Sequence, residues 1–246
     1  MFDKMPPAKT DSLVEIGSLF RADPRHDKID LGVGTYRDED GEVRIMTAVK
    51  EAEGWHLKSQ RSKAYLGPGG DRGFTSALAS ELFEDLPALG NGRLALVQTP
   101  GGTGAYRLAL ELAAYCSPQS TFIVGTPTWP NHIPVADRVG LRCATYRYYD
   151  SESGAVDFDA MLTAITEARP NDLFLIHGCC HNPTGATLST PQWKSLAAAL
   201  RKAALVPVID LAYAGMAKGL EEDVAATRFI LETFPEAYVA ISCSKS

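Results

Sequence analysis

From residue 94 onward, short apolar runs alternate with stretches of helical periodicity, and this alternation limits the chain to few folds. The runs are LALVQ (94–98), TFIVG (121–125), LRCATYRYY (141–149), LFLIHG (173–178), VPVID (206–210) and YVAIS (238–242). Runs that are apolar at consecutive positions are typical of strands in a parallel sheet covered on both faces. Helices are predicted between them at 103–116, 157–168, 190–204 and 223–234, the third with Thr190 as cap and Pro191 in its first turn. The order of elements predicts an α/β sandwich with right-handed crossovers.

The beginning of the chain lacks this alternation. Residues 11–22 carry apolar side chains at helical spacing behind an Asp/Ser cap, which predicts a short amphipathic helix. Residues 28–74 are rich in glycine and charge and contain the turns DEDGE and LGPGGDRG. We expect this second segment to be an irregular arm.

Composition narrows the class of partner. The chain has 246 residues, a net charge of −6 with acidic and basic residues interspersed, and no basic run that would indicate a nucleic-acid or membrane surface. We find no secretory signal and no apolar stretch of membrane-spanning length, so we expect a cytoplasmic protein with a small-molecule partner. The five cysteines include no C-x-x-C pair, which argues against a disulfide framework.

Unusual residues follow the predicted strands. LALVQ leads to TPGGTG, TFIVG to TPTWPNH, LFLIHG to CCHNPTG, VPVID ends on Asp210, and YVAIS leads to CSKS. Ligands of open α/β sheets bind just beyond the carboxyl ends of the strands. Five such endings therefore predict one shared site.

Each of these residues taken alone has an ordinary explanation as well as a functional one. The Gly101–Gly104 stretch could bind a phosphate at a helix N-terminus or form a plain strand-to-helix turn. Asp210 could face a protonated heterocyclic nitrogen or cap a loop. Tyr213 could be a packed aromatic side chain, and Lys245 could be a surface lysine or a nucleophilic amine of lowered pKa.

The segment from 177 to 183 holds two further features. His177, Cys179, Cys180 and His181 are residue types that bind metals, but their crowding lacks the spacing of a zinc site, so no metal is expected. The peptide bonds Thr126-Pro127 and Asn182-Pro183 are candidates for the cis form, because cis prolines gather at tight functional turns.

Several motifs together point to one family. IDLGVGTYRDEDG, AYLGPGG, QTPGGTGA, TPTWPNH, HGCCHNPTGA, IDLAYAG with GLEED, and SCSK occur in the same order as in the class I aminotransferases and closely resemble them. HGCCHNPTG and RYYD are most similar to the bacterial aromatic-amino-acid branch, although the aspartate branch shares nearly every motif. The resemblance runs from about residue 11 to the end of the chain.

The resemblance implies pyridoxal 5′-phosphate as cofactor and gives four residues a chemical role. Lys245 would form a Schiff base with the cofactor and, once displaced by substrate, carry the proton between substrate Cα and the cofactor. Asp210 would keep the pyridine nitrogen protonated, which makes the ring an electron sink. Asn182 and Tyr213 would hydrogen-bond the phenolic oxygen of the cofactor.

Other residues would hold the cofactor and substrate. Trp129 would stack on the ring, and His132 would support Asp210 without contacting the cofactor itself. The phosphate would be surrounded by Gly102, Thr103, Ser242 and Ser244, and by Tyr65 of a neighbouring subunit. Gly34, Trp129 and Asn182 would lie against the substrate. The role of Tyr65 implies a homodimer with shared active sites.

The implied fold is the large domain of the type I fold of pyridoxal-phosphate enzymes, a three-layer sandwich around a mostly parallel sheet. We expect an N-terminal arm with part of the small domain at 1–40 and the cofactor-binding domain at 41–246. The family's arginines and smaller domain that follow the lysine are absent from this sequence, so we expect the natural chain to continue past Ser246 by roughly 150 residues.

The resemblance implies transfer of an amino group from an aromatic amino acid or aspartate to 2-oxoglutarate. Two alternatives remain: a cofactor-binding module without catalysis, and a lyase that uses the same cofactor for β-elimination or decarboxylation. Joint retention of Lys245, Asp210, Asn182 and Tyr213 favours catalysis, and the WPNH and HNPTG motifs favour transamination.

Overall fold

The computed structural model describes residues 12–30, 34 and 38–245, and the chain divides into two compact units, Met1–Arg61 and Ser62–Ser246. In the first unit, the helix predicted at 11–22 is confirmed as α1 (Ser12–Ala22). The unit also contains α2 (Thr47–Ser59), so the prediction that 28–74 is irregular was wrong there. The α2 sequence is rich in good helix formers, but none of its residues is buried. The glycines, charges and turn motifs around it led the sequence analysis to expect an irregular arm instead.

The second unit is built on a five-stranded parallel sheet in the order β2-β1-β5-β6-β7. Its strands are β1 (Thr121–Thr126), β2 (Arg142–Arg147), β5 (Leu173–His177), β6 (Val206–Leu211) and β7 (Tyr238–Ile241). The helices of this unit are α3 (Arg72–Phe83), α4 (Pro87–Gly90), α5 (Gly101–Cys116), α6 (His132–Arg138), α7 (Phe158–Glu167), α8 (Thr190–Lys202) and α9 (Leu220–Thr233). The parallel sheet between helices confirms the predicted α/β fold.

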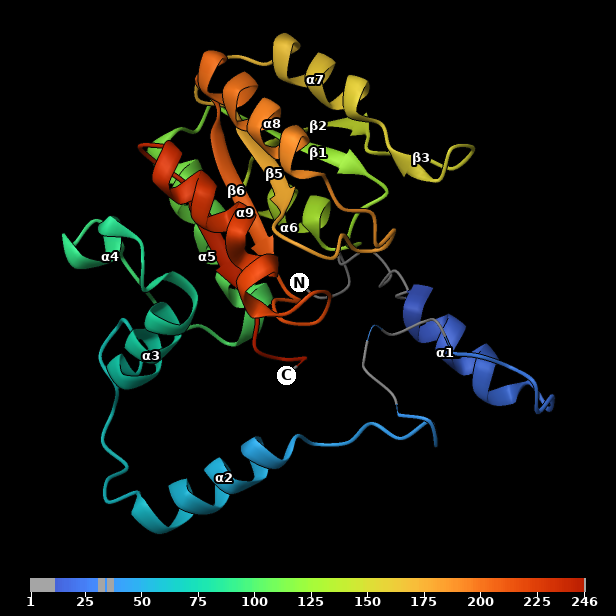
Figure 1. The fold of residues 1–246 in the computed structure, drawn as a ribbon, viewed down its shortest axis with the longest axis vertical. Helices are drawn as coiled ribbons and strands as arrows, with labels where there is room; N and C mark the ends of the chain where they lie inside the picture. Colours follow the sequence, from blue (N-terminus) through green and yellow to red (C-terminus); the bar gives the residue numbers. More distant parts are fainter. Residues whose placement is uncertain (1–11, 31–33, 35–37, 246) are drawn as a thin grey trace, which may run out of the picture. The chain divides into compact units, whose positions relative to one another are not determined.

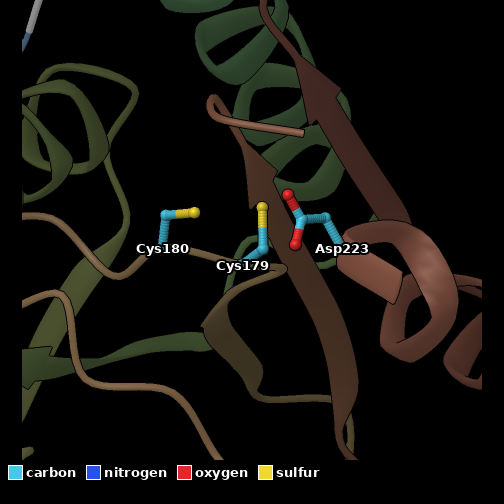
Figure 2. Close-up of side chains that lie close together, drawn as sticks. All are labelled: Cys179, Cys180 and Asp223. Atoms are coloured by element: carbon cyan, nitrogen blue, oxygen red, sulfur yellow. The ribbon is translucent and has the colours of Figure 1, made fainter. Parts of the chain in front are cut away.

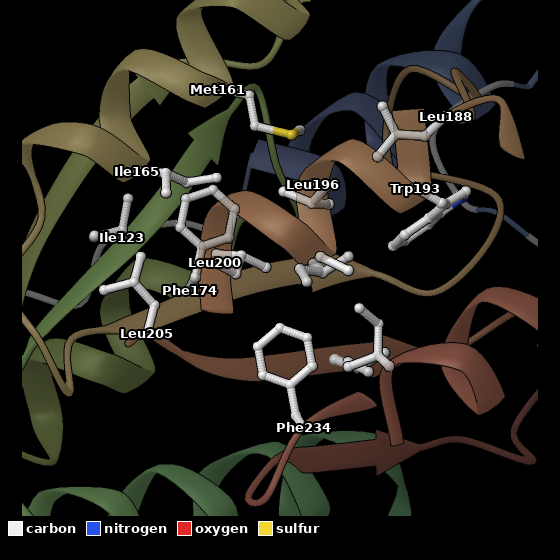
Figure 3. Close-up of a cluster of buried hydrophobic side chains, with 14 of the residues drawn as sticks. Ile123, Met161, Ile165, Phe174, Leu188, Trp193, Leu196, Leu200, Leu205 and Phe234 are labelled. Atoms are coloured by element: carbon white, nitrogen blue, oxygen red, sulfur yellow. The ribbon is translucent and has the colours of Figure 1, made fainter. Parts of the chain in front are cut away.

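Side chains that alternate along the strands form a separate core on each face of the sheet. Ile123, Phe174 and Ile209 pack with buried residues of α7, α8 and α9 (Figures 1 and 3). Phe122, Val124, Leu173, Leu175 and Val208 pack on the opposite face with α5 and α6. These layers are the three-layer sandwich that was predicted, and they fix the strand ends in which the site residues lie.

The run LALVQ at 94–98 is not a strand, contrary to the prediction. A strand needs a partner for its backbone N–H and C=O groups. Among the described residues, β7 pairs only with β6, and residues 94–99 lie across a groove of about 780 Å³ from β7. Leu94, Leu96, Val239 and Ile241 are among the residues that line this groove. The apolar character that predicted a strand thus serves to line a groove.

Several boundaries differ from the prediction. The run 141–149 divides into β2 and β3 (Tyr149–Asp150), and β3 pairs with β4 (Ala155–Val156) in a separate hairpin. The cap of α8 is Ser189 rather than Thr190, because Ser189 forms a capping box with Gln192. Both candidate cis peptide bonds, at Pro127 and Pro183, are confirmed.

Candidate active site

Four of the five predicted strand endings meet at one edge of the sheet. The strands β1, β5, β6 and β7 are parallel neighbours, so their carboxyl ends point the same way. The segments that leave this edge are 127–132 after β1, 178–183 after β5, 212–213 after β6 and 242–245 after β7. The fifth ending, TPGGTG, also reaches this region, because Gly102 of α5 packs against Ser242.

Asp210 lies near the end of β6 and is held by His132. The His132 Nε2 atom is 3.1 Å from the Asp210 carboxylate, and the histidine side chain is fully buried. The backbone of His132 is fixed in turn, because the Tyr106 hydroxyl donates to its carbonyl oxygen at 2.8 Å. The predicted pairing of His132 with Asp210 is present in the structure.

A chain of hydrogen bonds runs from Asn182 to Asp210, and the direction of each bond follows from the first donor. The backbone N–H of Asn182 donates to His177 Nδ1 at 3.4 Å, so a neutral His177 carries its proton on Nε2. His177 Nε2 then donates to Thr128 Oγ1 at 3.2 Å, and Thr128 donates to His132 Nδ1 at 2.7 Å. His132 is left to donate from Nε2 to Asp210. Asp210 is therefore the final acceptor in this chain of hydrogen bonds.

Burial keeps the supporting histidines neutral. Burial, with smaller repulsion from His181 and His132, places the pKa of His177 well below its usual value. Burial also lowers the pKa of His181 to about 4, and nearby Asp210 only partly opposes this shift. His181 stacks on Tyr148 with ring centroids 3.8 Å apart. Both histidines are thus uncharged at neutral pH, and the hydrogen-bond chain requires this of His177.

Tyr213, Asn182 and Lys245 come together from three different segments. Asn182 Nδ2 lies 3.5 Å from the Tyr213 hydroxyl, and Lys245 Nζ lies 4.7 Å from the centre of the Tyr213 ring. Burial raises the pKa of Tyr213, with smaller contributions from the negative charge of Asp210 and from Cys180. The phenol is protonated at neutral pH and can donate a hydrogen bond to an anionic oxygen.

The start of α5 forms a second part of the site. Gly101 has a φ of +66°, a value that favours glycine, and the helix begins without a side-chain cap. A Cβ on Gly102 would lie 2.8 Å from the Cβ of Ser242, so only glycine lets the helix approach this closely. A Cβ on Gly101 would be 3.6 Å from the Ser244 hydroxyl. Free N–H groups and two serines thus surround the positive end of a 16-residue helix.

The other predicted residues are placed less closely. Trp129 packs edge-on against His132 with centroids 5.1 Å apart, and Thr103 is exposed in the first turn of α5. Tyr65 is fully exposed within the second unit. Gly34 is exposed and belongs to the first unit. Within one chain, Tyr65 therefore lies outside the cluster.

Thr128 was not identified as a site residue from the sequence. His177 was considered only as one of four residues of a type that binds metals. Thr128 joins two histidines that are 4 and 49 residues away in the sequence. Its only sequence signal is a place in the turn after β1, which it shares with five other residues. The fold, not the local sequence, selects this hydroxyl.

Comparison with known proteins decides the family. Residues 26–246 match the aminotransferase class I and II family. The chain belongs to this family. It is 44% identical to the aromatic-amino-acid aminotransferase of Paracoccus denitrificans and 41% identical to the aspartate aminotransferase of Escherichia coli, in each case over the whole chain and 62% of the relative. The chain thus spans less than two thirds of the length of these relatives.

Solved structures agree with the family assignment. An aromatic-amino-acid aminotransferase from Burkholderia pseudomallei, covalently bound to pyridoxal phosphate, matches with a TM-score of 0.95 and 32% identity over the whole chain and 62% of that protein. The aspartate aminotransferase of Saccharomyces cerevisiae cytoplasm matches with a TM-score of 0.92 and 32% identity, over 100% of this chain and 61% of that one. No helix among the described residues is long and apolar enough to cross a membrane.

The geometry of this chain fits pyridoxal phosphate. The glycine-lined start of α5 with Ser242 and Ser244 offers donors for a phosphate. Asp210 offers a carboxyl group for a protonated ring nitrogen, and Tyr213 offers a phenolic donor. Lys245, whose Nζ lies 4.7 Å from the centre of the Tyr213 ring, offers an amine.

Proposed function

We propose that the protein is a pyridoxal-phosphate-dependent aminotransferase in which Lys245 links covalently to the cofactor. The observation that carries the proposal is the convergence of Asp210, a protonated Tyr213 and Lys245 at the carboxyl edge of the sheet. A bound phosphate group alone would need only the start of α5. The hydrogen-bond chain that ends on Asp210 supports a role in tuning a heterocyclic ring as well.

Each residue has a defined task in this proposal. When bound, pyridoxal phosphate supplies an electron sink for the charge that develops at substrate Cα on loss of a proton. Asp210 keeps the ring nitrogen protonated, and the hydrogen bond from His132 Nε2 holds the carboxyl group in position for this task. Asn182 and Tyr213 donate to the phenolic oxygen. Lys245 Nζ takes the proton from substrate Cα and delivers it to the cofactor.

The remaining residues position the cofactor and substrate. Gly102, Thr103, Ser242 and Ser244 hold the phosphate with backbone N–H and hydroxyl donors. Trp129 covers one face of the ring, and Gly34, Trp129 and Asn182 lie against the substrate. We assign residues 1–40 to the arm and part of a small domain, and residues 41–246 to the cofactor-binding domain.

The proposed substrates are an aromatic amino acid or aspartate as donor and 2-oxoglutarate as acceptor. Similarity to both aromatic-amino-acid and aspartate aminotransferases supports this pair of donor classes. A homodimer is also proposed, because Tyr65 is fully exposed in one chain and would reach the phosphate of its partner. The absence of basic runs in the sequence supports an enzyme without a nucleic-acid or membrane partner, and we propose that it is cytoplasmic.

Amino-donor profiling tests the proposed function. The protein from its own source is incubated with pyridoxal phosphate, 2-oxoglutarate and each of aspartate, tyrosine and phenylalanine, and glutamate formation is measured. We expect glutamate with at least one of these donors. Release of ammonia or carbon dioxide without glutamate would instead identify a lyase, and cofactor binding without turnover would identify a binding module.

A further inference from the structure

Two cysteines and an aspartate form a cluster that the proposed reaction does not use. Cys179 and Cys180 follow β5, and Asp223 lies in the first turn of α9 (Figure 2). One ligand atom from each residue lies within 4.8 Å of the other two. Cys179 and Asp223 are buried, whereas Cys180 is partly exposed and gives access from solvent.

The backbone around the cluster holds these atoms in place. Asp223 Oδ2 accepts hydrogen bonds from the N–H groups of Gly215 and Ala217, both at 3.0 Å, and Oδ1 accepts one from Lys218 at 3.1 Å. A carboxylate has about four lone-pair sites, so three bonds leave acceptor capacity on Oδ1. On the other side, Cys180 has a φ of +47° and its thiol donates to the Tyr213 carbonyl at 3.8 Å.

An unpaired polar atom lies beside the cluster. The Thr227 hydroxyl is buried and has no hydrogen-bond partner among the described residues. Thr227 follows Asp223 by one helical turn, so the two share a face of α9. Its Oγ1 lies only 2.8 Å from where a Cβ on Gly178 would be, which places it next to the residue preceding Cys179. A buried hydroxyl usually has a partner, and a water on a bound ion would supply one here.

The geometry points to Cys179, Cys180 and Asp223 as a binding site for a thiophilic divalent cation of the Zn²⁺ class. Two sulfurs and one carboxylate oxygen, with a water in the fourth position, match the ligand types and number that Zn²⁺ takes. Binding converts two thiols to thiolates and releases two protons to solvent. Thiol ligands select against Mg²⁺ and Ca²⁺, which take oxygen ligands.

Binding at this site has a consequence for the proposed active site. A cation on Cys180 removes the thiol proton that is donated to the Tyr213 carbonyl, and Tyr213 carries the phenol next to Asn182 and Lys245. Occupation of the cluster should therefore shift Tyr213 and inhibit the enzyme. This coupling rests on the proposed function, whereas binding of the cation does not.

Titration with Cd²⁺, which gives a thiolate charge-transfer absorption in the ultraviolet, tests the site. The exposed thiols are first removed with Cys116→Ser and Cys243→Ser. In that background we expect one Cd²⁺ per chain, displaced by Zn²⁺ but not by Mg²⁺. Cys179→Ala and Cys180→Ala should each weaken binding at least tenfold. The matched control Cys143→Ala, which removes a thiol elsewhere, should leave it unchanged.

Three results would overturn the proposal: no thiolate absorption in the background protein, equal binding after Cys180→Ala, or equal loss after Cys143→Ala. Circular dichroism of each variant shows whether it folds, and Cys180→Ser replaces Cys180→Ala if the alanine variant does not. The visible absorption of bound pyridoxal phosphate is recorded during the same titration. Cd²⁺ binding without a spectral change would reject only the coupling to Tyr213, and failure of the proposed function would leave Cd²⁺ binding intact.

Discussion

Replacing Thr128 by Val tests the hydrogen-bond chain behind Asp210. Valine has nearly the shape of threonine but no hydroxyl, so the substitution removes two hydrogen bonds without leaving a cavity. It leaves the Nδ1 acceptor of fully buried His132 and the Nε2–H donor of His177 without partners. An unsatisfied buried polar group costs about 1–3 kcal/mol. Since the His177 bond is the longer of the two, we expect a loss of about 2–4 kcal/mol in the free energy of unfolding.

Urea unfolding of the 246-residue chain measures this loss, with Thr128→Ser as the matched control. Serine keeps the hydroxyl and loses one methyl group, which costs about 1 kcal/mol. Thermal unfolding should show the same order, with Thr128→Val melting at least about 4 °C below the wild type. If Thr128→Val is as stable as Thr128→Ser within about 0.5 kcal/mol, the hydroxyl does not link the histidines.

The position of the His132 proton gives a second readout that loss of packing alone would not change. In the wild type, ¹⁵N chemical shifts should show His132 protonated on Nε2 and His177 also protonated on Nε2, as the chain of donors requires. In Thr128→Val, Asp210 still accepts from His132 Nε2, so the tautomer should be kept while the ¹⁵N shift of Nδ1 changes with the loss of its donor. A His132 protonated mainly on Nδ1 in the wild type would refute the direction of the chain.

Three further predictions concern the site. Asp210→Ala should leave the fold largely intact and lower the steady-state rate of transamination by well over tenfold. A tenfold loss corresponds to about 1.4 kcal/mol, and a smaller loss would show that Asp210 is not the ring partner. Trp129→Ala should weaken binding of pyridoxal phosphate by only about 1 kcal/mol beyond the loss of buried area, as measured by equilibrium dialysis, and unchanged affinity would exclude stacking. His181 has a pKa of about 4 in the folded chain against 6.5 when unfolded, so the unfolded state takes up the proton first as pH falls. Stability should therefore be lost between about pH 6.5 and pH 4, by about 3 kcal/mol, and urea unfolding at several pH values should show a smaller loss in His181→Asn. An equal loss in that variant would assign the pH dependence to other groups.

Apolar pattern predicted most strands of the sheet, but the pattern alone does not say what the apolar side chains contact. The strands β1, β5, β6 and β7 are apolar at successive positions because helices cover both faces of the sheet. The run 94–98 has the same character but lines a groove, and its pattern alone cannot distinguish the two cases. The helix α2 was missed because the glycines, charges and turn motifs of the segment around it were taken to indicate an irregular arm.

The site shows a similar division. Asp210 and Lys245 were singled out because each follows an apolar strand, and the resemblance to the aminotransferases gave them their roles. The pairing of His132 with Asp210 came from the resemblance to the aminotransferases and is seen at 3.1 Å. The link through Thr128 depends on the approach of β1 and β5, which no local pattern encodes. Nearness of Asp223 to Cys179 likewise arises only when α9 packs against the segment that follows β5.

Borohydride reduction followed by peptide mapping tests the central claim most directly. The protein is loaded with pyridoxal phosphate, reduced to make any imine permanent, digested and analysed by mass spectrometry. The label should lie on Lys245, in the segment SCSK after β7, and Lys245→Ala should carry none. The control Lys218→Ala, which removes an exposed lysine on another loop, should be labelled as fully as the wild type. A label on any other lysine, or full labelling of Lys245→Ala, would contradict the assignment of Lys245 as the cofactor-binding residue.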